Sequence, residues 1–223
     1  MSDTIKEGDT FDLNLFPTPV RLVSLPQKYA DVCSFFDEQK HNPDTGGNTK
    51  NYGSHSKNTY VLDDPVCKEF KKYMLGEIGK FNDEILGYDV KEWAFSQTWV
   101  SHKEPGQKHI MHTHPNSMIS GVFFYGGVAE KTSAIQFHSP ISFSGFNTMQ
   151  VEKKFNGKNP NTWTSFSVSF DVGKCVLFPS YFQHSVPVNE TDMTRKSVSM
   201  NIVPKGGVGS KNSLTELLFN RVK

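Results

Sequence analysis

The chain has little cysteine and no long apolar segment. Its 223 residues include three cysteines, Cys33, Cys67 and Cys175, an odd number with no closely spaced pair. This excludes a disulfide framework of the kind that stabilises small secreted domains. No run of about 18 apolar residues occurs and the first residues contain no apolar signal region, so we expect no membrane partner. The sequence therefore predicts a reduced, cytoplasmic protein.

The chain also lacks an excess of either charge. Its 24 Lys and Arg residues nearly balance 23 Asp and Glu residues, leaving a formal charge of +1. This balance gives no argument for nucleic acid as a partner. Aromatic residues, by contrast, make up 13% of the chain and include 18 Phe, which favours a core rich in β-sheet.

Helical patterns lie before and after the strand-rich part of the chain. Apolar residues recur at helical spacing from Pro26 to about Gln39, and again over residues 65–86. Asp64 and Pro65 mark the start of the second helix, because Asp is a common N-cap residue and Pro is favoured at the first helical position. Gly87 marks its C-terminal end. Residues 41–58 read as a long polar loop, and residues 213–222 as a terminal helix.

Seven short runs of β-branched and aromatic residues, separated by turn residues, follow Asp89. They cover residues 94–101, 109–114, 118–125, 133–138, 163–170, 174–178 and 197–203. The chain thus reads as one α+β domain over residues 1–223. Residues 1–92 form an N-terminal arm and helices, 93–204 a β-barrel core, and 205–223 a C-terminal tail or helix. Residues 145–161 look like a surface insert, and we expect them and residues 41–58 to be candidate substrate lids.

Three histidines form the candidate metal site. His112 and His114 are two residues apart, so in a strand their imidazoles leave the same face. His184 follows the apolar run 174–178 and a turn, at the start of another short strand. Two ligands from one strand and one from a distant strand leave part of an octahedral shell open, as in non-haem iron oxygenases. The remaining histidines read as core or surface residues, and His109, three residues before His112, is expected to face away from it.

Arg195 and Ser197 form a candidate anion site. They lie eleven and thirteen residues after His184. They are two residues apart, so their side chains share one face if the predicted strand 197–203 begins at Arg195. The planar fork of an arginine pairs bidentately with a carboxylate, and a serine adds a hydroxyl donor. A dicarboxylate that chelates the metal at one end would meet Arg195 at the other.

These motifs resemble the 2-oxoglutarate- and iron(II)-dependent oxygenases, in particular the prolyl-hydroxylase-like group of marine phages and bacteria. The resemblance rests on residues 15–19, 112–125, 135–140 and 173–203, in that order along the chain. It implies a double-stranded β-helix, which is a jelly-roll or cupin-like barrel, with flanking N-terminal helices. It also implies Fe(II), 2-oxoglutarate and O2 as cofactor and cosubstrates, with succinate and CO2 released as the substrate is hydroxylated.

The resemblance also implies roles for individual residues. His112 and His184 would be iron ligands, and Arg195 with Ser197 would bind the far carboxylate of 2-oxoglutarate. Tyr125 would point towards the cosubstrate. Relatives have Asp or Glu where His114 stands, so either His114 completes a three-histidine site or a loop carboxylate such as Glu104 replaces it. The expected substrate is a protein side chain or a small molecule.

Two other functions fit parts of the sequence. A cupin that uses its metal without 2-oxoglutarate would share the spacing of the histidines, but it would have Glu soon after His114, where Met118 and Ile119 stand. A jelly-roll binding module without catalysis would bind metal only incidentally. The pair of Arg195 and Ser197 favours the oxygenase over the cupin.

Overall fold

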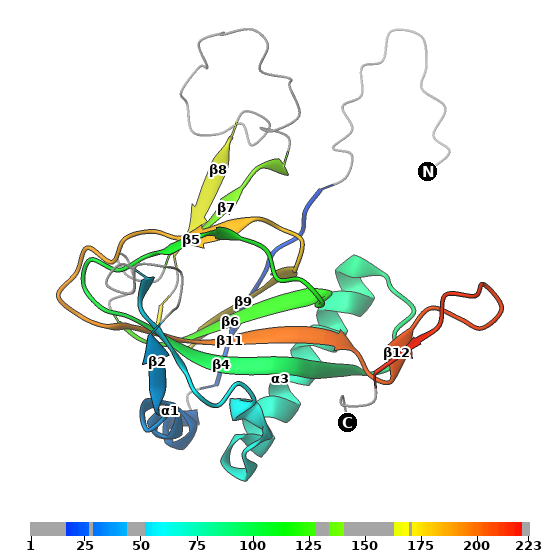
Figure 1. The fold of residues 1–223 in the computed structure, drawn as a ribbon, viewed down its shortest axis with the longest axis horizontal. Coiled ribbons are helices and arrows are strands. Elements are labelled where there is room, and N and C mark those ends of the chain that lie inside the picture. Colours follow the sequence, from blue (N-terminus) through cyan, green and yellow to red (C-terminus); the bar gives the residue numbers. More distant parts are fainter. Residues whose placement is uncertain are drawn as a thin grey trace, which may run out of the picture.

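Two main antiparallel sheets, a small two-stranded sheet and two principal helices make up the described part of the structure (Figure 1). The structure is a computed structural model, and it describes residues 17–26, 29–43, 52–127, 134–140, 163–169 and 171–219. In Figure 1 the smaller sheet lies above the larger one, and α3 runs below the larger sheet. The architecture is therefore a pair of facing sheets with helices on the outer face of one of them.

The larger sheet has seven strands in the order β1-β9-β6-β11-β4-β3-β2. Their bounds are β1 Arg21–Ser24, β2 His41–Pro43, β3 Ser54–Ser56, β4 Trp93–Lys103, β6 Ile119–Gly126, β9 Lys174–Pro179 and β11 Arg195–Pro204. Every neighbouring pair is antiparallel. The longest strands, β4 and β11, pair over their whole length at the centre of the sheet.

The smaller sheet has four strands in the order β5-β10-β7-β8. Their bounds are β5 His109–His112, β7 Ile135–His138, β8 Ser165–Val168 and β10 His184–Val186. These strands and those of the larger sheet confirm the seven predicted runs and the short strand predicted at His184. Within the described residues, no strand of one sheet pairs with a strand of the other, so the β-barrel predicted over residues 93–204 is not closed.

Both predicted N-terminal helices are present, the second with the predicted bounds and the first shorter than predicted. Helix α1 spans Ala30–Asp37 and α3 spans Lys68–Phe81, preceded by short turns at Val61–Asp63 and Pro65–Cys67 and followed by a π-helical turn, η4, at Asn82–Leu86. The Asp64 carboxylate accepts a hydrogen bond from the Val66 amide. Gly87, with a φ of 71°, ends the run, because glycine adopts the left-handed conformation without a steric penalty.

Strand β6 separates two hydrophobic cores. Phe123 and Tyr125 face the helices, in a core that also contains Phe36 and Phe70. Val122 and Phe124 face the smaller sheet, where they pack with other apolar residues of both sheets: Ile135, Phe137, Val176 and Phe178. Successive side chains of a strand point to opposite faces, so one uniformly buried strand contributes to both cores.

Two predictions for the ends of the chain and the polar loop are wrong. Where a terminal helix was expected over residues 213–222, the described part has a turn and β13 (Leu217–Leu218), paired with β12 (Gly207–Val208). Its apolar side chains have no core to pack on, and Leu214 is 93% exposed. A helix this short is marginal without such packing.

The polar loop over residues 41–58 contains β2 and β3 in its described part. The buried Ser56 hydroxyl donates to the Asn58 carbonyl oxygen and accepts from the Val100 amide. Hydrogen bonds to a neighbouring strand, which leave no apolar pattern in the sequence, therefore hold β3 in place. Residues 44–51 and the predicted insert at 145–161 lie outside the described residues.

None of the described helices is both long and apolar enough to cross a membrane.

We predict that Phe70→Ala lowers the free energy of unfolding by about 3–5 kcal/mol, the range typical of a buried phenylalanine. Phe70 is fully buried and packs on Tyr29, Phe36 and Phe123, with ring centroids 5.0–5.9 Å apart. Urea unfolding measures the change. Ile85→Ala, at a 55% exposed position in η4, is the control and should lose much less. Equal losses would contradict this account of the helix–sheet core.

Candidate metal centre

His112, His114 and His184 converge between the two sheets. One ring nitrogen from each lies within 4.8 Å of the others. The Nε2 atoms of His112 and His114 are 3.2 Å apart, and the ring centroids of His112 and His184 are 4.3 Å apart. The structure thus brings together the three histidines that the sequence singled out.

Backbone pairing positions each imidazole. His112 in β5 lies directly opposite His184 in β10. His114 lies two residues beyond the end of β5, and its amide donates to the carbonyl oxygen of Ser180 at 3.0 Å. The cluster therefore depends on the pairing of β5 with β10 and on the turn before β10.

Every imidazole in the cluster uses Nδ1 for a hydrogen bond to an oxygen. Nδ1 of His112 donates to the carbonyl oxygen of Ile110 at 2.8 Å, and Nδ1 of His184 to that of Phe182 at 2.9 Å. Nδ1 of His114 donates to Oδ1 of Asn201 at 2.6 Å. These contacts assign the proton to Nδ1 and leave the Nε2 lone pairs for a ligand.

Burial keeps these imidazoles neutral. It is the largest cause that lowers the pKa of His184 to about 3 and the pKa of His114 to about 4, and it lowers the pKa of His112 as well. A metal binds the neutral form of imidazole. Three neutral, converging Nε2 atoms therefore fit a divalent transition metal such as Fe(II), to which imidazole is well suited.

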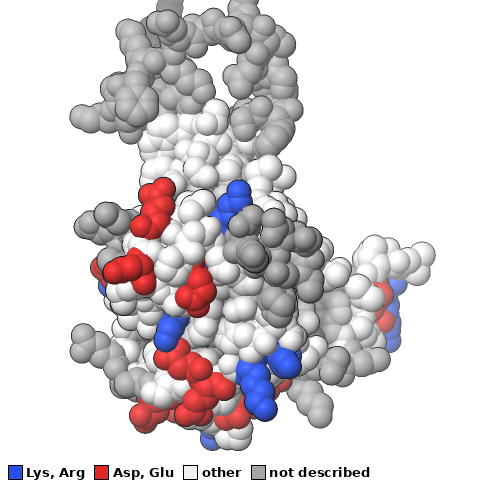
Figure 2. Space-filling model, turned by 60° about the vertical axis from the view of Figure 1, so that its left-hand side comes forward, with Lys and Arg blue, Asp and Glu red and all other residues white. Residues whose placement is uncertain are grey.

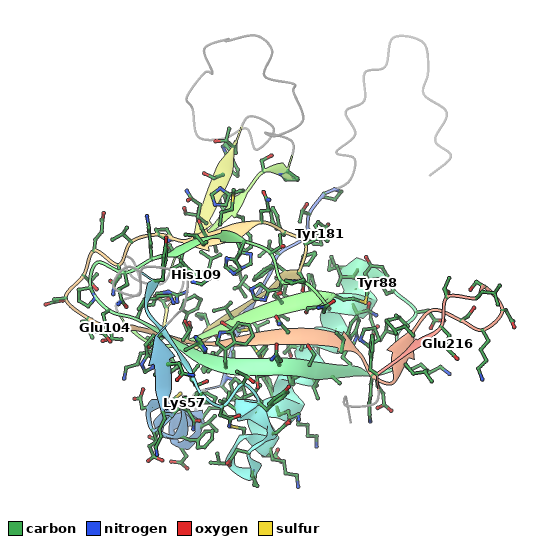
Figure 3. The ribbon with its side chains drawn as sticks, in the orientation of Figure 1. Lys57, Tyr88, Glu104, His109, Tyr181 and Glu216 are labelled. Carbon is green, nitrogen blue, oxygen red and sulfur yellow. The ribbon has the colours of Figure 1, made fainter. Side chains whose placement is uncertain are left out.

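The alternative ligand Glu104 is not part of the cluster. Glu104 follows the end of β4, and its Oε2 accepts a hydrogen bond from the Thr194 hydroxyl at 2.7 Å. In Figure 3 it lies at the outer left edge of the molecule, away from His109. Among the described residues, the only metal-type cluster of three or more His, Cys, Asp or Glu is the histidine triad.

The prediction that His109 faces away from His112 is wrong. Their ring centroids are 4.5 Å apart in an edge-to-face arrangement, and both side chains line the same cavity. The register explains this, because His109 and His112 lie opposite Val186 and His184 respectively. Three residue steps along β5, from His109 to His112, thus match two steps along β10. Such a bulge-like irregularity changes which side chains share a face.

A cavity of about 300 Å³ extends from the histidines across the inner face of the larger sheet. Its lining includes the predicted metal and anion sites and Trp99, and none of the described residues that line it is Asp or Glu. The lining residues are His55, Thr59, Gln97, Trp99, Ser101, Lys103, His109, His112, His114, Val122, Ile135, His184, Val186, Arg195, Ser197 and Ser199. Its charged side chains are therefore cationic.

Arg195 and Ser197 lie in this cavity. Arg195 is 2% exposed, one of its terminal nitrogens donates to the Ser197 hydroxyl at 3.1 Å, and its guanidinium lies 4.6 Å from the centroid of Phe124. Nε of Arg195 is buried and has no partner, and burial lowers the pKa of the guanidinium to about 9. A buried cation with an unsatisfied donor is a site for an anion.

Lys103 is a cavity residue that the sequence did not single out. It lies directly opposite Arg195 in the pairing of β4 with β11 and is 1% exposed. Strand alternation offered a signal for it, because Lys103 shares a face with Trp99 and Ser101 along β4. The cavity therefore has two cations at its Arg195 end.

The prediction that Tyr125 points to the cosubstrate is wrong. Tyr125 belongs to the core between the larger sheet and the helices, whereas its neighbour Phe124 faces the cavity side and stacks on Arg195. The Tyr125 hydroxyl lies 2.8 Å from Nε2 of His102, and the ring of His102 stacks on His41 at 4.2 Å. Tyr125 thus belongs to a half-buried polar cluster on the other face of the sheet.

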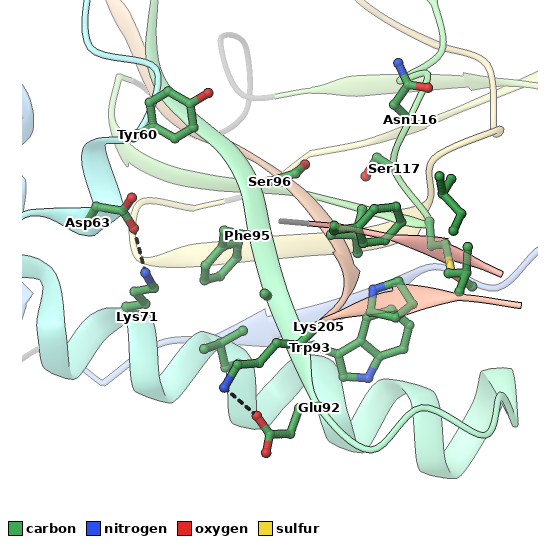
Figure 4. A pocket seen from close by; sticks show the side chains of 18 residues that line it. Tyr60, Asp63, Lys71, Glu92, Trp93, Phe95, Ser96, Asn116, Ser117 and Lys205 are labelled. Atoms are coloured by element: carbon green, nitrogen blue, oxygen red, sulfur yellow. Dashed lines mark hydrogen bonds and ion pairs between the residues drawn. The ribbon is translucent and has the colours of Figure 1, made fainter. Parts of the chain in front are cut away.

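A larger cavity, of about 1200 Å³, lies beside the start of β4 (Figure 4). Trp93 and Phe95 line it, and two ion pairs flank it, Lys71 with Asp63 and Lys205 with Glu92. None of the three histidines lines it, so it is separate from the metal centre.

Comparisons with known proteins agree with this geometry. The family model described as putative 2OG-Fe(II) oxygenase matches residues 97–201, which include all three histidines and Arg195 with Ser197. No curated protein matches the chain at the sequence level.

Solved structures share the fold. The non-haem α-ketoglutarate-dependent epimerase SnoN from nogalamycin biosynthesis is 11% identical, with a TM-score of 0.60, over 85% of this chain and 80% of that one. A prolyl-4-hydroxylase from Pseudomonas putida is 14% identical, with a TM-score of 0.56, over 85% and 94%. HygX from Streptomyces hygroscopicus, with nickel, 2-oxoglutarate and hygromycin B bound, is 10% identical, with a TM-score of 0.52, over 84% and 83%.

The two facing sheets have the double-stranded β-helix fold of these solved structures, as the sequence predicted, and the histidine centre fits a divalent metal ion. Residues 97–201 match the family model of 2OG-Fe(II) oxygenases, and the fold is shared with solved 2-oxoglutarate-dependent oxygenases.

We predict that the protein loses stability as the pH falls from about 6.5 to about 4, and that His102→Gln reduces this loss. Burial is the largest cause, followed by the charge of His41, that lowers the pKa of His102 to about 4. The unfolded imidazole has a pKa of about 6.5, so the unfolded chain takes up the proton first and acid favours unfolding. Urea unfolding at pH 7 and pH 5 tests this. An equal loss in both proteins would contradict it.

Proposed function

We propose that the enzyme hydroxylates an organic substrate, and that His112, His114 and His184 hold its iron through Nε2. The observation that carries the proposal is the convergence of three Nδ1-protonated imidazoles in one cavity with a buried arginine. When bound, Fe(II) with 2-oxoglutarate supplies the activation of O2, and succinate and CO2 are released.

The protein's own residues bind and orient the reactants in this proposal. Arg195 and Ser197 hold the far carboxylate of 2-oxoglutarate, because the guanidinium is buried and its Nε lacks a partner. Phe124 fixes the guanidinium by stacking on it at 4.6 Å. Val122 and Ile135, both buried and both lining the cavity, exclude water from the reacting centre.

A protein side chain or a small molecule is the proposed substrate. The cavity volume of about 300 Å³ is at the lower end of the range for small-ligand sites. Among the described residues on the face drawn in Figure 2, Lys and Arg lie among Asp and Glu and form no continuous basic band. Nucleic-acid backbones require such a band.

Similar folds serve both substrate classes, since one solved relative is a prolyl hydroxylase and another holds hygromycin B. The grouping with marine phages and bacteria and the cytoplasmic location remain predictions from the sequence.

The decisive experiment is an assay of succinate release with Fe(II), 2-oxoglutarate and O2 across pools of peptides, amino acids, small metabolites and nucleosides. One pool should raise succinate release above the substrate-free rate, and mass spectrometry should find a product heavier by one oxygen atom. Stimulation by oligonucleotides alone, added as a further pool, would contradict the proposed substrate class. Absence of an anaerobic visible absorption band with Fe(II) and 2-oxoglutarate would contradict the proposed iron and cosubstrate sites.

We predict that His184→Ala abolishes turnover and weakens metal binding by at least about 100-fold, because one of three ligands is lost. Titration of the metal-free protein with Co(II), followed by tryptophan fluorescence, measures the affinity. His138→Ala is the matched control, since His138 lies in the same sheet, contacts the Ser185 hydroxyl and does not line the cavity. Metal binding by His184→Ala at the affinity of this control would refute the ligand assignment.

We predict that Arg195→Ala raises the half-saturating concentration of 2-oxoglutarate by about 10- to 100-fold, since a charged hydrogen bond contributes about 1.5–3 kcal/mol. The affinity for Co(II) should stay near that of the unchanged protein, because Arg195 is not a ligand. Ser197→Ala should act in the same direction but less strongly. An equal loss of metal binding in the Arg195 and His184 variants would count against the separate roles.

A further inference from the structure

One member of the histidine cluster is held differently from the others. Nδ1 of His112 and Nδ1 of His184 each donate to a backbone carbonyl two residues earlier in their own segment. For His114 that position is His112, and its Nδ1 instead donates to the side chain of Asn201, 87 residues away. The orientation of His114 therefore depends on a side chain that a single substitution removes.

Asn201 lies next to a β-bulge in the pairing of β11 with β4. It is the last residue before a register shift, because Asn201 pairs with Gln97 and the next residue, Ile202, pairs with Phe95. The extra residue on β4, Ser96, donates from its hydroxyl to the Asn201 carbonyl oxygen at 3.3 Å. Irregularities of this kind often redirect a side chain next to an active site. On its other side, Asn201 keeps its regular pairing with Ser120.

The hydrogen bond from His114 to Asn201 is short, and aromatic rings pack around the imidazole. The distance from Nδ1 to Oδ1 is 2.6 Å. The ring of Trp99 lies near His114, with centroids 5.8 Å apart, and Phe178 approaches edge-on at 6.5 Å. Packing limits the tilt of the imidazole, whereas the hydrogen bond decides which nitrogen carries the proton.

We propose that Asn201 is a positioning residue for the metal centre: its Oδ1 fixes His114 as the Nδ1-protonated tautomer and aims Nε2 at the metal. The inference rests on the proposed function of the histidine cluster. It goes further because it assigns the orientation of the third ligand, which stands where relatives place a carboxylate, to a strand on the opposite sheet.

An amide has a particular consequence at this position. Asn201 accepts a hydrogen bond but cannot become an anion, so His114 and its partner add no negative charge to the centre. A carboxylate in the same place would make the imidazole a stronger donor to the metal, as carboxylate–histidine pairs do. The chain therefore offers the metal three neutral imidazoles with a neutral partner behind the third.

The first test reads the tautomer in the metal-free protein. Long-range ¹H–¹⁵N spectra of ¹⁵N-labelled protein should show His114 protonated at Nδ1. In Asn201→Ala the ring should shift to a mixture of tautomers, while His112 and His184 keep theirs. An unchanged His114 spectrum in Asn201→Ala would overturn the proposal. This readout needs no metal, so its failure is distinguishable from a failure of the proposed function.

The second test measures Co(II) affinity with the metal-free protein and no 2-oxoglutarate. Asn201→Ala should bind about 10- to 100-fold more weakly, the usual effect of losing such a partner. Asn201→Asp should restore the affinity and shift the visible absorption of bound Co(II), because the carboxylate strengthens the imidazole donor. Gln97→Ala is the matched control, since Gln97 is also an amide, lies opposite Asn201 and lines the cavity.

Two outcomes of the second test would count against the inference. Affinity in Asn201→Ala equal to that of the Gln97→Ala control would show that Asn201 does not position His114. Weak binding in both Asn201 variants, together with lowered thermal stability of both metal-free proteins, would assign Asn201 to the fold alone. No Co(II) binding by the unchanged protein would refute the proposed function and leave the tautomer test to decide on Asn201.

Discussion

The pairing of β5 with β10 is the constraint on which the site depends. It sets His112 directly opposite His184, although the two residues lie far apart in the chain. On its other edge β10 pairs with β7, so His184 also lies opposite Phe137. The amide of His114 is then held by the Ser180 carbonyl just before β10. Backbone hydrogen bonds thus place all three imidazoles, and side chains only adjust how the rings turn.

Much of this arrangement was predictable because it follows from strand alternation and local signals. Asp64, Pro65 and Gly87 mark the second helix, and the structure has those boundaries. His112, His114 and His184 were linked by their spacing and by the turn before His184, and they do converge. Each of these signals is carried by neighbouring residues, so the sequence alone reveals it.

The features that the sequence did not reveal depend on contacts between distant segments. His109 joins the cavity because β5 and β10 are out of step by one residue, which no local pattern records. The contact between His114 and Asn201, like the pairing of Arg195 with Lys103, requires knowing how β11 lies in the larger sheet. Strand β3 escaped notice because polar residues bind it to β4.

The alternation along β11 limits how this protein can change. One face of the strand presents Arg195, Ser197 and Ser199 to the cavity, while Val198 and Met200 pack into the core on the other face. Adding or deleting one residue within this stretch would exchange the two faces, with polar groups in the core and apolar ones in the cavity. A single insertion or deletion would therefore disrupt both the hydrophobic core and the candidate site. Changes of length are therefore tolerated in the connections between strands, whereas β11 can evolve only by substitution.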